Sequence, residues 1–166
     1  MTDPLLPRSY TSLGAQLSEL GNYEEARTAL HEALELNPQK EHDHALQGEV
    51  LLAQGFPDQA LVEIEQEPSK FWRHLNEALA YATLNRLAQS HEALSAVIAT
   101  DQNGAAPEIA AAYAYRGESD KAFAWLDRAY RQRDGGLTYV KVDPLLISLR
   151  RDPRYADLLM KMHLPM

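Results

Sequence analysis

Apolar residues recur every three or four positions over most of the chain, and glycines or prolines interrupt this recurrence at intervals. Within residues 10–20, Leu13, Leu17 and Leu20 fall on one face of a helix. A second apolar stripe follows the short turn sequence GNY, and Pro38 ends it because proline disfavours helix in the residue before it. The pattern predicts two helices joined by a tight turn.

The same pattern returns after 34 residues, as in proteins built from structural repeats. The residues that share this offset are Gly14 with Gly48, Leu17 with Leu51, Gly21 with Gly55, and Ala26 with Ala60. Glycine and alanine are small enough to let two helices cross closely, and a glycine in the turn adopts a positive φ without strain. The sequence therefore predicts an array of similar helix pairs.

This pattern resembles the tetratricopeptide repeat, in which an aromatic residue, a Leu-Gly pair, an alanine and a closing proline recur every 34 residues. The matching residues of the first repeat are Tyr10, Leu13, Gly14, Leu17, Ala26, Leu30, Ala33 and Pro38. The second repeat matches at Gly48, Leu51, Gly55, Ala60 and Ile64. It departs from the pattern at Glu67 and Pro68, where we expect its second helix to end early. The resemblance implies an all-α fold, a right-handed α-solenoid.

We expect a single domain of about four helix-turn-helix units followed by a C-terminal cap of short helices. The units cover about residues 7–38, 41–68, 70–100 and 106–133, and the cap covers residues 137–164. The third unit is shorter than the others, and Asn85 stands near the place of its turn glycine.

The tail breaks the repeat pattern and is expected to cover the last open face of the array. Asp143-Pro144 and Asp152-Pro153 each place a capping acid before a proline, which predicts two short helices that begin at these prolines. The sequence LTYVKV alternates like a strand, but a lone strand has no pairing partner in a helical array. We therefore expect it to be an extended, packed segment.

The last two units and the tail also resemble a C-terminal arrangement found behind such repeats in large bacterial regulatory proteins. The sequences AYRGESDKAFAWLDRAY, LTYVKVDPLL and LRRDPRYADLL carry this resemblance. Those proteins have cyclase, kinase or winged-helix domains upstream. The resemblance implies an alternative role as a sensor or regulatory module of a larger signalling protein.

Charge and composition narrow the classes of function. The net charge is −8, whereas nucleic-acid binders are basic because neutralising phosphates supplies most of their affinity, so we expect no nucleic-acid partner. Residues 1–103 carry 6 Lys and Arg against 16 Asp and Glu, which fits solvated helix faces or an acidic surface for a basic partner. Without a membrane-spanning apolar run, a secretory signal or any cysteine, the chain is expected to be cytoplasmic.

The sequence contains no motif that indicates catalysis or a cofactor, so we expect a protein that is not an enzyme. His42 and His44 were considered as metal ligands, but residues two apart point to nearly opposite sides of a helix, so no metal site is expected. The carboxylates of Glu63, Glu65 and Glu67 are expected on a solvated helix face.

The tetratricopeptide resemblance implies that the first helices of successive units line a concave groove for a peptide or a partner helix. The candidate groove residues carried over from the repeat register are Arg8, Thr11, Glu49, Leu52, Trp72, Asn76, Leu79 and Tyr115. Only Arg8 and Asn76 suit a clamp for a peptide carboxylate, so the apolar lining favours an amphipathic helix or a self-docking segment. Two alternatives remain, namely self-association into a homo-oligomer and a core position for Trp72.

Overall fold

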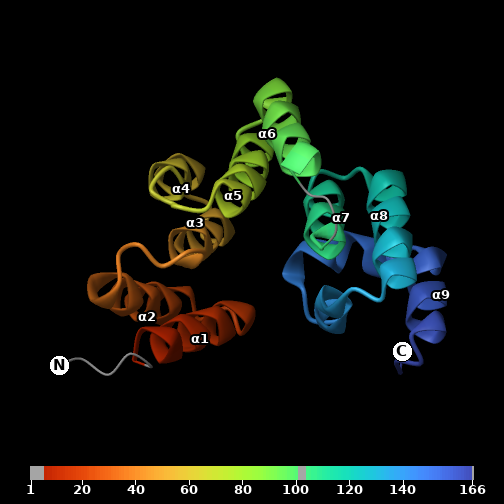
Figure 1. Ribbon diagram of the computed structural model, residues 1–166, viewed down its shortest axis with the longest axis horizontal. Coiled ribbons are helices and arrows are strands. Elements are labelled where there is room, and N and C mark those ends of the chain that lie inside the picture. Colours follow the sequence, from red (N-terminus) through yellow and green to blue (C-terminus); the bar gives the residue numbers. More distant parts are fainter. Residues whose placement is uncertain (1–5, 101–103, 166) are drawn as a thin grey trace. The chain divides into compact units, whose positions relative to one another are not determined.

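The computed structural model describes residues 6–100 and 104–165, and within these ranges it is built from helices and their connections, without strands (Figure 1). The helices follow one another in pairs: α1 (Leu6–Glu19) and α2 (Tyr23–Leu36), α3 (Asp43–Ala53) and α4 (Pro57–Ile64), α5 (Lys70–Thr83) and α6 (Leu87–Thr100), α7 (Ala106–Tyr115) and α8 (Ser119–Gln132). The cap consists of the 3-10 helices η1 (Gly135–Tyr139) and η2 (Pro144–Arg151) and of α9 (Pro153–Lys161). The all-α class and the helical repeats with a cap of short helices are confirmed.

Contacts between residues divide the chain into two compact units, residues 1–93 and residues 94–166. In the first unit α2 packs between α1 and α3, and α4 packs between α3 and α5. In the second unit α7 packs against α8, η1 and η2. The proposal that the repeats and the cap act as a single domain stays a prediction.

Each helix pair turns at a residue with positive φ. Gly21, Gly55 and Gly117 have φ values of 78°, 83° and 76°. Asn85 occupies the corresponding place in the third pair with a φ of 57°, a conformation that asparagine tolerates better than most residues. Gly14 shows the second role of glycine in the repeat, because a Cβ atom there would lie 2.6 Å from Cγ of Leu30 in α2.

The second repeat ends early, as the sequence predicts. Helix α4 stops at Ile64, and turns follow up to Pro68. The expectation for the side chain of Glu67 was wrong, however, because this residue is 0% exposed and does not lie on a solvated face.

The expectation of an extended segment at LTYVKV was also wrong, because Gly135–Tyr139 is a 3-10 helix. The side chain of Asp134 accepts a hydrogen bond from the backbone N–H of Gly136 at 2.9 Å and so starts the helix. The backbone N–H of Val140 donates to Leu137 and continues the turn. Local capping therefore decided a segment whose apolar pattern alone suggested an extended chain.

The cap covers α7 with its apolar side chains. Leu146 and Leu149 of η2 are buried, and the hydroxyl of Ser148 donates to the carbonyl of Ala114 at 3.1 Å. The hydroxyl of Tyr155 in α9 donates to the carbonyl of Val140 at 2.8 Å and ties the cap together. Burial raises the pKa of the Tyr155 phenol.

Candidate functional site

The first helices of the first three pairs, α1, α3 and α5, form the surface on which the sequence predicts a partner. Helix α3 contacts α1 on one side and α5 on the other, so the three helices lie next to one another in the first unit. We call the surface that carries Arg8, Glu49 and Trp72 the first-helix face. Among the predicted lining residues, these three keep side chains that are exposed or half-buried and are not fixed by a hydrogen bond to a neighbouring helix that accounts for their position.

Thr11 holds α1 against α3. Its hydroxyl lies 2.9 Å from Oδ2 of Asp43, a carboxylate that is 0% exposed. Lys40 pairs with the same carboxylate at 2.5 Å and balances its charge. Because a buried carboxylate is costly without such partners, Thr11 contributes to the packing of the first two pairs.

Glu67 joins the second pair to the third. Its carboxylate accepts hydrogen bonds from the backbone N–H groups of His42 at 3.0 Å, Ala45 at 3.2 Å and Ser69 at 3.0 Å. The first N–H groups of a helix have no partner within the helix and attract negative charge, so one carboxylate serves the starts of both α3 and α5. No periodicity in the sequence marks this residue, because Glu67 lies outside any helix.

His42 and Trp72 form a stacked pair at the starts of α3 and α5. Their ring centroids are 3.8 Å apart with an angle of 22° between the planes. Burial lowers the pKa of His42 to about 4, although the nearby charges of Glu67 and Asp43 act in the opposite direction. His42 is therefore neutral near pH 7 and presents a flat surface that supports the half-buried indole of Trp72.

The other predicted lining residues lie deeper or elsewhere. Leu52, Asn76 and Leu79 are buried, with 9%, 0% and 1% of their surface exposed. Asn76 donates to the carbonyl of Trp72 at 3.1 Å, while its own side-chain oxygen has no hydrogen-bond partner among the described residues. Tyr115 is 37% exposed but belongs to the second unit. Any role of these four residues in binding stays a prediction.

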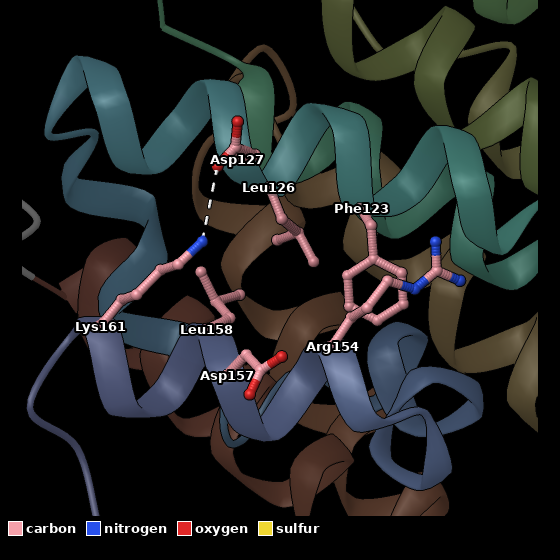
Figure 2. Close-up of a pocket in the computed structure, with 7 residues that line it drawn as sticks. All are labelled: Phe123, Leu126, Asp127, Arg154, Asp157, Leu158 and Lys161. Atoms are coloured by element: carbon pink, nitrogen blue, oxygen red, sulfur yellow. Dashed lines mark ion pairs between the residues drawn. The ribbon is translucent and has the colours of Figure 1, made fainter.

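The second unit has a pocket of about 170 Å³ between α8 and α9 that the sequence did not reveal (Figure 2). Its lining residues are Phe123, Leu126, Asp127, Arg154, Asp157, Leu158 and Lys161. As Figure 2 shows, the lining side chains of α8 and of α9 face each other across an apolar floor with charged groups at its edges.

The charges at the edge of this pocket largely neutralise one another. The guanidinium of Arg154 lies 4.2 Å from the ring centroid of Phe123 and pairs with Asp120 at 2.8 Å and with Asp152 at 2.7 Å. Hydrogen bonds to these two carboxylates raise the pKa of Arg154. Since the pocket depends on the docking of α9, which is part of the cap, it has no local sequence signature.

The histidines near the second repeat do not converge. His44 contacts Glu63 through Nδ1 at 2.6 Å and the carbonyl of Pro38 through Nε2 at 3.3 Å, whereas His42 stacks on Trp72. In the described part of the chain, no group of three or more His, Asp or Glu side chains is arranged to hold a metal ion. No helix among residues 6–100 and 104–165 has the length and hydropathy needed to cross a membrane.

Comparison with known proteins bears on the first helix pair. Residues 7–40 match the family model of the tetratricopeptide repeat. This range contains α1, α2 and the loop that follows them, and it includes Gly14 at the close helix crossing and Gly21 at the turn. A search of curated proteins finds no match for the chain.

Proposed function

Because residues 7–40 are a tetratricopeptide repeat, and such repeats generally mediate protein–protein interaction, we propose that this chain holds a segment of a partner protein on its first-helix face. The observation that carries the proposal is the stack of Trp72 on His42, which holds a large aromatic side chain half-buried at the start of α5. Tryptophan often contributes a large share of the binding energy at protein interfaces. The partner segment would be an amphipathic helix or an extended peptide.

The surroundings of Trp72 suit a partner that is anchored by an apolar side chain. His42 covers one side of the indole and Phe71 meets it edge-on at 4.9 Å, so the ring is fixed before a partner arrives. A preordered aromatic loses little conformational entropy on binding. Glu49 on α3 and Arg8 on α1 would then orient the segment through its polar groups.

The same proposal treats the chain as a scaffold without catalytic activity, cofactor or metal, which is the usual role of tetratricopeptide repeats. The resemblance of the C-terminal part to bacterial regulatory proteins supports a cytoplasmic bacterial context. It also supports the alternative that the chain is a regulatory module of a larger signalling protein.

Peptides selected from a display library against the full chain provide the test. Their affinity is then measured by calorimetry for the parent chain, Trp72→Ala and Phe56→Ala. Phe56 is the matched control, because it is an aromatic residue that is 45% exposed in the turn before α4. We expect Trp72→Ala to weaken binding by at least about tenfold, as for an anchor residue, and Phe56→Ala to leave it unchanged.

Folding must be separated from binding in this experiment. Trp72→Ala should cost about 1–3 kcal/mol of unfolding free energy, less than a fully buried tryptophan, because the indole is only half-buried. Glu49→Arg provides a second variant that reverses a charge on the face without removing an aromatic ring. Binders that tolerate both Trp72→Ala and Glu49→Arg would place the interaction elsewhere and contradict the proposal.

A further inference from the structure

Three leucines form an exposed line along α1 and its last turn. Leu6, Leu13 and Leu20 are 40%, 47% and 75% exposed. They are seven residues apart, which is close to two helical turns, so their side chains lie above one another. The opposite side of the helix is already used, because Gly14 packs there against Leu30 of α2.

The charges of α1 follow a second line beside the leucines. Arg8 and Glu19 are the only charged residues of α1, and both are exposed. They are eleven residues apart, about three turns, and therefore share one side of the helix. Neither forms an ion pair with another described residue. Ser9, Ser12 and Gln16 lie between the two lines and leave room for another helix to approach.

We propose that this surface docks a second copy of the chain, with the two α1 helices antiparallel and Leu13 close to the two-fold axis. Arg8 lies five residues before Leu13, and Glu19 lies six residues after it. An antiparallel pair therefore places Arg8 of each copy beside Glu19 of the other. The same arrangement sets the leucine at each end of the line against the leucine at the opposite end of the second helix.

The symmetry of the surface is what selects a second copy as the occupant. A two-fold interface uses the same patch on both molecules, so that patch must be complementary to itself. The leucine line reads the same in both directions from Leu13, and the charges on either side of it have opposite signs. A parallel pair would instead place like charges at the same level, which is unfavourable. The inference does not depend on the partner-binding role of Trp72.

The first experiment measures the mass of the full chain by sedimentation velocity over a series of concentrations. We expect a reversible equilibrium between monomer and dimer, and Leu13→Asp should raise the dissociation constant by at least about tenfold, since it places two carboxylates at the centre of the interface. Val62→Asp is the matched control, because Val62 is an apolar residue of α4 that is 64% exposed. It should leave the dissociation constant unchanged.

A charge exchange gives an independent test that does not rely on an apolar substitution. Arg8→Glu and Glu19→Arg should each weaken the dimer by roughly three- to tenfold, because two attractions become repulsions. The double variant restores both pairs with their signs exchanged and should return to within about threefold of the parent. A parent chain that stays monomeric at the highest concentration, a Leu13→Asp dimer as strong as the parent, or a double variant as weak as its two losses combined would each overturn the proposal.

Discussion

The carboxylate of Glu67 accepts a hydrogen bond from the backbone N–H of His42 at 3.0 Å, although the two residues are 25 positions apart. His42 adopts a φ of 80°, which is unusual for a residue other than glycine. The hydrogen bond stabilises that conformation at the start of α3, and the conformation in turn brings the imidazole onto Trp72. A buried glutamate in a loop therefore sets the geometry of the aromatic stack on the first-helix face.

Replacing this carboxylate should be costly. Glu67→Gln keeps the size of the side chain but turns an acceptor oxygen into an amide donor that faces backbone N–H groups. We expect a loss of about 1.5–3 kcal/mol in unfolding free energy, as for a hydrogen bond to a charged group. Urea denaturation followed by circular dichroism measures this loss. Glu65→Gln is the control, because Glu65 is exposed two residues earlier; equal effects of the two substitutions would show that the buried carboxylate contributes nothing special.

His42 should make the stability of the chain depend on pH. Burial lowers the pKa of its imidazole from 6.5 to about 4, and the charge of Lys40 adds to the lowering while Glu67 and Asp43 oppose it. The unfolded chain therefore binds a proton at a higher pH than the folded chain does. This contribution to stability is fully present above about pH 6.5 and is lost as the pH falls towards about 4. Between about pH 7 and 5 the loss should be about 2 kcal/mol.

Unfolding free energies at these two pH values check this expectation. His42→Asn removes the titrating group and keeps a residue type that tolerates positive φ, so it should reduce the pH dependence by the amount stated. His31→Asn is the control, because 65% of the His31 side chain is exposed. If the His42 variant retains the full pH dependence of the parent, another group is responsible.

The close crossing of α1 and α2 should not tolerate even one added methyl group. An alanine Cβ at position 14 would lie 2.6 Å from Cγ of Leu30, whose side chain is 0% exposed and has no free space to move into. Gly14→Ala should therefore lower the unfolding free energy by about 1–3 kcal/mol through overpacking. Nothing lies within 4 Å of a Cβ atom at Gly135, so Gly135→Ala should have little effect. Coincident thermal melts of the two variants would contradict this account of the crossing.

The repeat architecture could be predicted because its determinants are local. Gly14, Gly21 and Asn85 recur at places where a small side chain or a positive φ is needed, and the helix pattern between them is continuous. The early end of α4 before Pro68 follows from the same local reasoning.

The features that were missed depend on contacts between distant parts of the chain. The burial of Glu67 becomes apparent only when the starts of α3 and α5 are brought to one loop. Likewise, Leu79 repeats the register of a groove residue yet is 1% exposed, since register fixes the side of a helix and not what covers it. Thr11 has the expected position, but its hydroxyl is already engaged by Asp43.

The C-terminal cap should contribute to the stability of the second unit through the side chains it places on α7. Leu149 of η2 is 0% exposed, and two positions earlier on the same short helix Ile147 is 56% exposed. Leu149→Ala should cost about 2–5 kcal/mol through lost burial and the cavity left behind, whereas Ile147→Ala should stay within about 0.5 kcal/mol of the parent. Denaturant unfolding of both variants in the full chain measures the difference. Because the two substitutions remove side chains of the same size from one helix, a general effect of altering the cap would change both equally. Equal losses would mean that η2 does not hold its face against α7, and a loss confined to Leu149→Ala would identify the cap as part of the folded core.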